Sequence, residues 1–309
     1  MKAVFFGTPD FAVPVLKALA AHHNVLAAVT QPDKPKNRGK KLIPTPVKQA
    51  AEDLGIEVLQ PVSAKTDKFI DKLKEYNADV FVVAAYGQIL PKALLEIPEY
   101  GSINVHGSLL PKYRGAAPVQ QAIMDSEKTT GITIMYMAER LDAGDMLLKA
   151  ETPIGEDETG GELEKRLSIL GADALIKALR LLEEGKITPE KQDEEKHTYA
   201  HKITKETGLI DFSKSASEIK NLIRALNPSP AAYTFYNGEK LKVFKAETVS
   251  EEREASLGEI ISADKKGILV KTGKDCLLIK EIQAPGSKIM PVSAYILGHK
   301  IEKGKILGE

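Results

Sequence analysis

The chain has 309 residues, of which 43% are hydrophobic and 28% are charged, the composition of an ordinary soluble globular protein. Its 43 basic and 43 acidic residues balance, so the net charge does not indicate a polyanionic partner. The single cysteine, Cys276, excludes an internal disulfide and a cysteine-based metal cluster, and its apolar neighbours indicate a buried thiol without chemistry.

No stretch approaches the roughly 20 apolar residues that a membrane-spanning helix needs. The first predicted strand begins at Ala3, so we expect no signal or transit peptide before the fold. We therefore expect a cytoplasmic protein that has no membrane partner and acts as a monomer. A length of 309 residues is too long for one typical domain and predicts two.

The N-terminal part of the chain alternates predicted strands with predicted helices. Apolar runs at residues 3–6 and 25–29 predict strands, and the segment between them has the apolar periodicity of a helix. A continuous apolar run at residues 80–85 predicts a central strand that is covered on both faces. No G-x-G-x-x-G pattern follows the first strand, so we do not expect a dinucleotide site.

Residues 31–46 differ in kind, because they combine five basic residues with one acidic residue and four prolines. The proline spacing excludes a helix and predicts an exposed loop. Loops of this length in a compact domain are usually functional or disordered. Two alternatives remain: a solvated surface loop without a partner, or a basic grip on a phosphate backbone through Arg38, Lys40 and Lys41.

The stretch 101–118 carries the strongest pattern in the chain. Its first residues alternate polar and apolar, so Asn104 and His106 share one face of a predicted strand. Two residues of strand rise about 6.6 Å, which lets an amide and an imidazole address one small substrate group. Gly107 stops the strand, and a loop rich in Pro and Gly follows, as at the sites of open α/β sheets. A lone histidine here would more often be a buried side chain satisfied by a neighbour.

Beyond this stretch, residues 130–137 and 146–153 read as strands, and a capping box at Thr159 opens a long amphipathic helix. The turn between the two strands offers two carboxylates, Asp142 and Asp145. A polar segment then includes His201 and Lys202, which serve either solubility or contact with a polyanion. From Leu209 onward, one helix and five short strands separated by turn signals predict a small β-barrel, most plausibly of the oligonucleotide-binding (OB) type.

Asn-x-His, the loop Ser-Leu-Leu-Pro-Lys-Tyr-Arg-Gly-Ala-Ala-Pro and the later Leu-Asp-x-Gly together resemble the folate-dependent formyltransferase family, in particular its branch that acts on methionyl-tRNA. Arg224 opens a further stretch, R-A-L-N-P-S-P-A-A, which resembles the start of the second domain in that branch, so the resemblance covers almost the whole chain. The implied fold is an α/β, Rossmann-like open-sheet catalytic domain at 1–188, a linker at 189–206, and an OB-like tRNA-binding domain at 207–309.

The resemblance implies that 10-formyltetrahydrofolate is the co-substrate and that initiator methionyl-tRNA, used in translation initiation, is the acceptor. It assigns catalysis to Asn104, His106 and Asp142, and it alone selects Asp142 over Asp145. It assigns folate contacts to two loops. One loop contains Tyr86, Gly87 and Gln88, and the other contains Ser108, Leu109, Leu110 and Pro111. It assigns tRNA contacts to Arg38, Lys40, Lys41 and Lys202.

Formyl transfer to an amine builds negative charge on the formyl oxygen, and a neutral Asn104 amide can donate a hydrogen bond to that oxygen. His106 could donate to the same oxygen or move a proton. Asp142 could orient His106, keep it protonated, or order a water. The reaction needs no covalent nucleophile, and the sequence has no metal-binding pattern.

Two other functions compete with this interpretation. An enzyme that formylates a small amine, such as glycinamide ribonucleotide or an amino sugar nucleotide, needs neither the basic 31–46 loop nor a second domain. An RNA-binding module with an inactive enzyme fold does not need an intact Asn104, His106 and Asp142. We therefore expect a tRNA-formylating enzyme.

Overall fold

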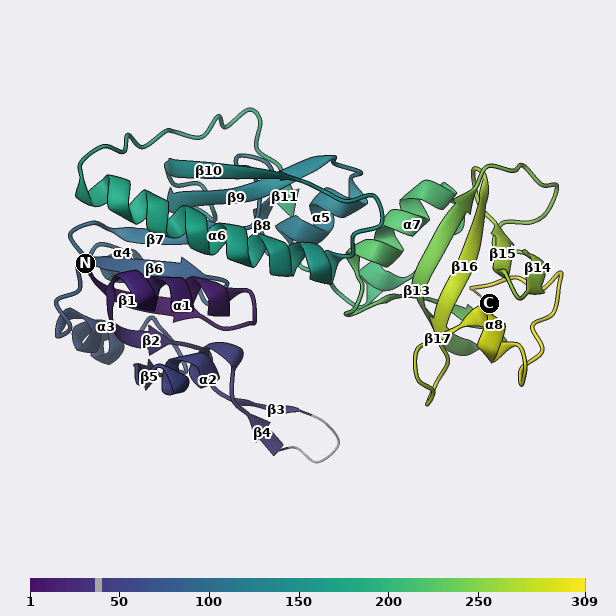
Figure 1. Ribbon diagram of the computed structural model, residues 1–309, viewed down its shortest axis with the longest axis horizontal. Helices are drawn as coiled ribbons and strands as arrows, with labels where there is room; N and C mark the ends of the chain where they lie inside the picture. Colours follow the sequence, from purple (N-terminus) through teal and green to yellow (C-terminus); the bar gives the residue numbers. More distant parts are fainter. Residues whose placement is uncertain (37–40, 309) are drawn as a thin grey trace. The chain divides into compact units, whose positions relative to one another are not determined.

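The computed structural model describes residues 1–36 and 41–308 (Figure 1). The chain forms two compact units, which are not continuous in sequence. Unit 1 contains Met1–Pro118, Thr129–Pro153 and Glu164–Ala200, and unit 2 contains Val119–Lys128, Ile154–Leu163 and His201–Glu309. The predicted domain limits at 188 and 207 are not tested by this division and stay a prediction.

Unit 1 is built on a seven-stranded sheet with the strand order β10-β9-β7-β6-β1-β2-β5. The five strands from β7 to β5 are parallel, and β9 and β10 add an antiparallel edge. The strands are β1 (Lys2–Gly7), β2 (Asn24–Val29), β5 (Glu57–Leu59), β6 (Val80–Ala84), β7 (Ser102–His106), β9 (Thr129–Tyr136) and β10 (Met146–Pro153). The apolar runs predicted β1, β2 and β6, and the alternation of polar and apolar residues predicted β7 and β9.

Helices cover both faces of this sheet. The rings of Phe6 and Phe81 lie on one face, 5.4 Å apart, and belong to one buried cluster with Leu73 of α3. On the other face, α6 lies so near that a Cβ on Gly171 would come within 2.8 Å of Val105. Figure 1 shows α1 and α6 on the same side of the sheet. The helices are α1 (Ala12–His22), α2 (Pro46–Asp53), α3 (Asp67–Lys74), α4 (Lys92–Leu95) and α6 (Gly160–Glu183).

The order in which successive strands are added to the sheet reverses at β1. Strands β2 and β5 lie on one side of β1, whereas β6 and β7 lie on the other. Gly7 is paired with Ala84, so the carboxyl ends of β1 and β6 lie level at one edge of the sheet. Open α/β sheets bind ligands beyond such an edge, at the strands where the order reverses.

Part of the basic 31–46 segment forms a hairpin, which differs from the predicted irregular loop. Strands β3 (Lys34–Lys36) and β4 (Lys41–Ile43) pair in antiparallel fashion, and Pro35 is tolerated because this two-stranded sheet has only edges. The base of the hairpin is fixed by Asp33, whose carboxylate accepts from Lys48 at 2.7 Å and from Gln60 at 2.6 Å. Arg38, Lys40 and the side chain of Lys41 lie outside the described residues.

The polar segment after α6 belongs to unit 1 as far as residue 200. Glu190 forms a bridge with Met146, and β11 (Tyr199–Ala200) pairs in parallel with β8 (Arg114–Gly115). These strands are two residues long, so they leave no periodicity that a sequence pattern could reveal.

Unit 2 contains a six-stranded sheet with the order β12-β13-β16-β15-β14, to which β17 adds beside β16. Its core packs Ile219 and Ile223 of α7 with apolar residues of the strands. Ser215 and Glu218 cap the start of α7 reciprocally. The elements are α5 (Pro118–Met124), η1 (Glu206–Gly208), α7 (Ala216–Ala225), β12 (Ala232–Tyr236), β13 (Glu239–Val249), β14 (Ile260–Asp264), β15 (Gly267–Lys271), β16 (Cys276–Gln283), β17 (Met290–Pro291) and α8 (Val292–Tyr295).

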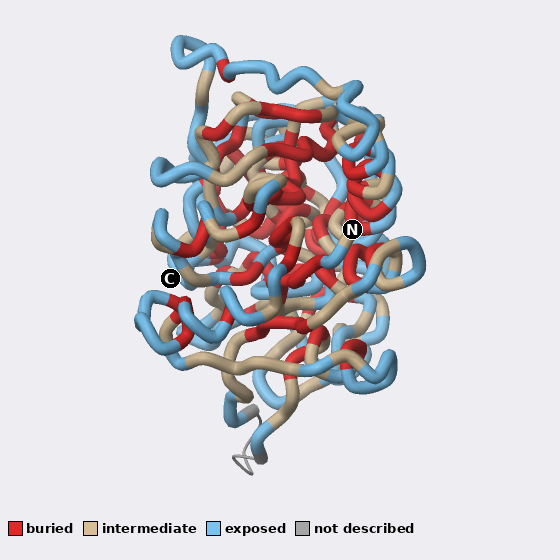
Figure 2. Tube along the Cα trace, turned by 90° about the vertical axis from the view of Figure 1, so that its left-hand side faces the viewer, coloured by how far each residue is buried: buried red, intermediate tan, exposed pale blue. Residues whose placement is uncertain are grey.

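The predicted fold class is confirmed: a Rossmann-like α/β sheet followed by a smaller unit of antiparallel strands. Figure 2 shows the buried stretches of chain inside the molecule and the exposed stretches around them. Cys276 lies in β16 with no exposed surface, and burial raises the pKa of its thiol. Across residues 1–36 and 41–308, no helix combines the length and the apolar character that crossing a membrane requires.

Candidate active site

The carboxyl end of β7 carries the two polar side chains of the Asn-x-His pattern. Asn104 is 8% exposed and His106 is 5% exposed. Within the described part of the chain, the Asn104 side chain makes no hydrogen bond. Its amide atoms are not among the buried polar atoms that lack a partner, so they reach solvent at the edge of the sheet, where a ligand can bind them. Asn104 therefore offers free N–H donors beside His106.

The His106 ring is held from one side by the backbone. Its Nε2 lies 2.9 Å from the carbonyl oxygen of Tyr113. A carbonyl oxygen can only accept, so Nε2 carries a hydrogen and donates it there. The other ring nitrogen, Nδ1, lies 3.7 Å from Oδ2 of Asp142, which is longer than a hydrogen bond. Nδ1 is therefore the ring atom that can exchange a proton with a substrate.

Of the two candidate carboxylates in the turn between β9 and β10, Asp142 is the one that lies against His106. Its Oδ2 also accepts a hydrogen bond of 2.8 Å from the backbone N–H of Gly115. Its backbone has a φ of +48°, in the left-handed region that few residues other than glycine adopt. The turn thus presents the Asp142 carboxylate in a constrained backbone conformation.

The Ser108–Pro111 loop is fastened to β9. Thr133 donates from its hydroxyl to the Ser108 carbonyl at 2.7 Å and accepts from the Leu110 N–H at 3.0 Å. Leu110 is 1% exposed and packs with Met135 and Met146, whereas Leu109 and Pro111 are half-buried. Both leucines were predicted to offer apolar surface to a folate. Leu109 keeps part of its apolar side chain exposed, whereas Leu110 faces the core, and the folate contacts of this loop stay a prediction.

The Tyr86–Gln88 loop follows β6 at the same edge. The Tyr86 ring packs on Phe6, with centroids 5.5 Å apart, and its burial raises the pKa of the phenol to about 12. Thr8 donates a hydrogen bond of 2.8 Å to the Tyr86 carbonyl, and the Gln88 amide oxygen accepts from the backbone of residue 64 at 2.9 Å. Gly87 is exposed, with a φ of +85°. The side chains on both sides of Gly87 thus fix the loop and leave its backbone exposed.

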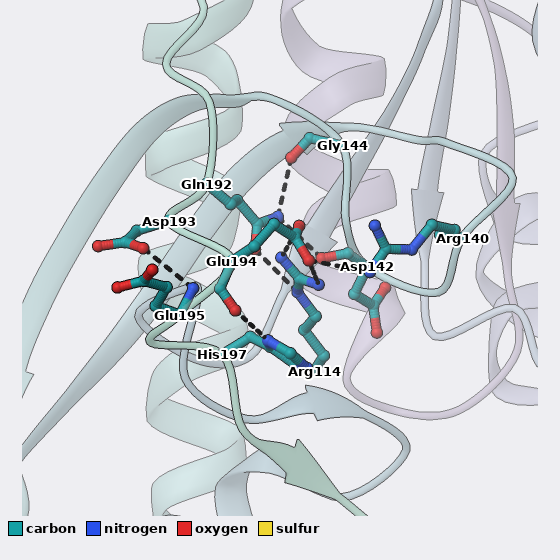
Figure 3. Close-up of polar contacts among 9 residues, drawn as sticks. All are labelled: Arg114, Arg140, Asp142, Gly144, Gln192, Asp193, Glu194, Glu195 and His197. Carbon is teal, nitrogen blue, oxygen red and sulfur yellow. Dashed lines mark hydrogen bonds and ion pairs between the residues drawn. The ribbon is translucent and has the colours of Figure 1, made fainter.

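The sequence left the role of Arg114 open between a ligand contact and support of its own loop. Arg114 has no exposed surface, and Figure 3 shows its guanidinium against the segment that follows α6. Its Nε donates to Gln192 at 3.0 Å, and a terminal nitrogen lies 2.9 Å from Glu194. Arg114 and then Arg140 lower the pKa of the Glu194 carboxyl to about 2. These contacts favour the supporting role.

Gln192 is the residue of this site that sequence reasoning missed. Its side-chain nitrogen donates to the carbonyl oxygens of Asp142 and Gly144, each at 2.8 Å (Figure 3). No motif marks Gln192, because it stands alone in a polar segment.

Of the predicted tRNA contacts, Lys202 is exposed and belongs to unit 2, whereas Arg38, Lys40 and the side chain of Lys41 lie outside the described residues. Among the residues that the structure describes, no three His, Cys, Asp or Glu side chains are grouped to hold a metal ion. The roles assigned from the sequence, including the absence of a metal, stay predictions.

Comparisons with known proteins agree over the whole chain. A family model described as formyl transferase matches residues 1–179, and one described as formyl transferase C-terminal domain matches residues 202–300. A relative named methionyl-tRNA formyltransferase from Clostridioides difficile (strain 630) is 52% identical over 309 residues, which cover 100% of both chains. One of the same name from Alkaliphilus metalliredigens (strain QYMF) is 49% identical over 310 residues, covering 100% of this chain and 99% of the relative.

Among solved structures, WlaRD, a sugar 3N-formyl transferase determined in the presence of dTDP and 5-N-formyl-THF, has a TM-score of 0.67 to this chain. The match covers 93% of this chain and 99% of that chain. At 19% identity, this similarity shows a shared fold alone.

Proposed function

Because the chain belongs to the formyl transferase family, we propose that it transfers the formyl group of 10-formyltetrahydrofolate to the free α-amino group of methionyl initiator tRNA. Relatives of that name are 52% and 49% identical over essentially their full length, so both domains are shared. The observation that carries the chemistry is the unpartnered Asn104 amide beside His106 and Asp142 at the end of β7. This function serves translation initiation, and we place it in the cytoplasm, where charged tRNA is used.

The loops at the sheet edge suit a reduced folate. Gly87 presents an exposed backbone that can bond the edge of a flat heterocycle, and Leu109 offers apolar side-chain surface. Ser108 donates its hydroxyl to the Lys112 carbonyl at 2.6 Å, so it shapes its own loop and contributes backbone groups to a ligand. When bound, 10-formyltetrahydrofolate supplies the activated formyl carbon. Apart from this co-substrate, we propose no cofactor and no metal.

Asn104 stabilises the charge that forms on the formyl oxygen. Its carboxamide donates a hydrogen bond that strengthens as the amine adds and the carbonyl oxygen becomes negative. The Asn104 N–H groups need break no bond to the described protein before they bind, so they are arranged in advance of the reaction. A donor of this kind is worth about 2.7–4 kcal/mol in the transition state.

His106 moves the proton. Its Nε2–H is held by the Tyr113 carbonyl, so Nδ1 accepts the proton that the attacking amine loses as the new C–N bond forms. Nδ1 then returns this proton to the folate nitrogen as the bond from that nitrogen to the formyl carbon breaks. The Asp142 carboxylate, 3.7 Å from Nδ1, stabilises the imidazolium that exists between the two transfers.

The acceptor is held by basic side chains outside this catalytic group. We assign phosphate contacts to Arg38, Lys40 and Lys41 of the 31–46 segment and to Lys202, which follows β11 in the chain. A monomer carries both sets of contacts and the complete catalytic group, so the proposed reaction needs no second copy of the chain.

The test is a formylation assay with three acceptors side by side: charged initiator tRNA, charged elongator tRNA and glycinamide ribonucleotide, each with 10-formyltetrahydrofolate. We expect the initiator tRNA to be formylated and the small amine not to be. Formylation of glycinamide ribonucleotide with no reaction on either tRNA would overturn the proposed acceptor and favour the small-amine enzyme.

A further inference from the structure

We propose that Gln192 is a positioning residue for formyl transfer, which fixes the Asp142 turn so that its carboxylate faces His106. The inference rests on the proposed function and adds to it a residue that lies outside the matched catalytic pattern. Gln192 belongs to the segment that follows α6, which returns to the active site and contacts both sides of the His106–Asp142 pair.

Every polar group of the Gln192 side chain is used. The nitrogen donates to the carbonyl oxygens of Asp142 and Gly144 at 2.8 Å each, and the oxygen accepts from Nε of Arg114 at 3.0 Å. Carbonyl oxygens cannot donate and a guanidinium cannot accept, so only one orientation of the amide satisfies all three bonds. Gln192 is 9% exposed, which makes it a buried, fully bonded amide (Figure 3).

The Asp142 turn needs such a support. A non-glycine residue with a φ of +48° costs free energy, and this conformation persists only where the surroundings hold it. At Gly144 the turn lies so close to β9 that a Cβ would come within 1.9 Å of the Tyr136 carbonyl oxygen. Gln192 bonds the carbonyl groups of both residues. The turn is therefore held between β9 and Gln192, and the direction of the Asp142 carboxylate follows from that.

The same segment also supports His106. The Thr198 hydroxyl accepts a hydrogen bond of 2.9 Å from the Tyr113 N–H, and the Thr198 carbonyl accepts one of 2.9 Å from the N–H of Arg114. Tyr113 in turn accepts the hydrogen bond from His106. Gln192 and Thr198 therefore set the two partners of the pair from one stretch of chain. The charge of the buried Arg114 between them is balanced by Glu194.

The geometry distinguishes positioning from simple packing. Gln192→Glu keeps the size of the side chain and its bond to Arg114, but it places a carboxylate oxygen against the two carbonyl oxygens. Gln192→Ala removes all three bonds. A packing role predicts that Glu is tolerated, whereas a positioning role predicts that Glu is no better than Ala.

The experiment measures kcat and KM for charged initiator tRNA and 10-formyltetrahydrofolate in the full-length protein. We expect both Gln192 variants to lose about 10- to 100-fold in kcat, because small misplacements of a catalytic group cost this much. Both KM values should stay within about threefold, since Gln192 lies outside the proposed substrate contacts. Glu195→Ala, at an exposed position of the same segment, is the matched control and should behave like the wild type.

A double-mutant cycle decides whether Gln192 acts through Asp142. In an Asp142→Asn background, adding Gln192→Ala should lower kcat by less than about threefold, because the carboxylate that Gln192 positions is gone. Equal losses in both backgrounds would overturn the inference, as would wild-type kcat in the Gln192 variants. If thermal unfolding shows that only one variant folds, that variant decides; if neither folds, the role is structural and the inference fails. An inactive wild type would overturn the proposed function and this inference with it.

Discussion

Replacing Asn104 by alanine should separate catalysis from stability more cleanly than any other change in this protein. The Asn104 side chain is 8% exposed and has no hydrogen-bond partner among the described residues, so its removal breaks no protein–protein hydrogen bond. The buried side-chain polar atoms without a partner in the described chain are the Tyr86 and Thr234 hydroxyls, so the Asn104 amide atoms reach solvent and carry no such penalty. We therefore expect the free energy of unfolding to stay within about 1 kcal/mol of the wild-type value.

The effect on catalysis should be large. If the Asn104 amide donates to the formyl oxygen, its loss removes about 2.7–4 kcal/mol of transition-state stabilisation. At about 1.4 kcal/mol for each factor of ten, this corresponds to a loss of roughly 10²–10³-fold in kcat. The affinity for tRNA should change little, because the basic residues that we assign to phosphate contacts are untouched.

Ser102 provides the matched control, because it lies on the same strand and the same face, two residues before Asn104. Its hydroxyl donates a hydrogen bond of 3.0 Å to the Leu95 carbonyl, and it is 3% exposed. Ser102→Ala leaves that carbonyl without its partner and should cost about 1–3 kcal/mol of stability, while kcat stays near the wild-type value. The two variants should thus show opposite patterns.

The assay combines urea unfolding with steady-state formylation of charged initiator tRNA. An Asn104→Ala protein that turns over within a few-fold of the wild type would refute the oxyanion role. A variant that loses several kcal/mol of stability together with activity would show that Asn104 has a structural partner, and the argument from its unused amide would fail.

Three further predictions concern other parts of the chain. Alanine at Arg38, Lys40 and Lys41 should lower the slope of log K for tRNA against log salt by about 0.7–0.9 for each phosphate that is no longer neutralised. Folate binding should not change, and an unchanged slope would show that the segment does not bind tRNA. Cys276→Ser should keep full turnover, because its thiol is buried in β16 and formyl transfer needs no nucleophile; an inactive but folded variant would call for a covalent step. Arg114 holds the pKa of Glu194 at about 2, below its ordinary 4.5, so this carboxylate stabilises the fold above about pH 4.5 and loses that effect as the pH falls towards 2. The difference in Tm between the wild type and Glu194→Gln should therefore shrink on acidification from pH 5 to pH 2, and a constant difference would contradict it.

The sequence determined most of the regular structure, because each element carries a local signal of its own. The run at residues 80–85 is apolar without interruption, as a strand covered on both faces must be, and β6 occupies Val80–Ala84. In unit 2, the turn signals predicted one helix followed by five short strands, and α7 is followed there by β12, β13, β14, β15 and β16. Asn104 and His106 were found by the same reasoning, since their spacing on one strand fixes a shared face.

Pattern and residue type left open which carboxylate joins them; the family resemblance selected Asp142, and the tertiary structure shows the contact. Asp142 and Asp145 lie in one turn, and residue type does not separate them. The fold brings Oδ2 of Asp142 to 3.7 Å from Nδ1 of His106. The same holds for Leu110, whose apolar side chain suits either a ligand or the core, and which folding directs to Met135 and Met146.

The support of the pair was hidden from the sequence altogether. Gln192 bonds a turn 50 residues earlier in the chain, and the strand pair β8 and β11 has two residues in each member. Neither feature leaves a periodicity or a motif, because each depends on one contact between distant segments. Such contacts depend on how the sheet places these distant segments, so their partners could not be predicted from the amino-acid order alone.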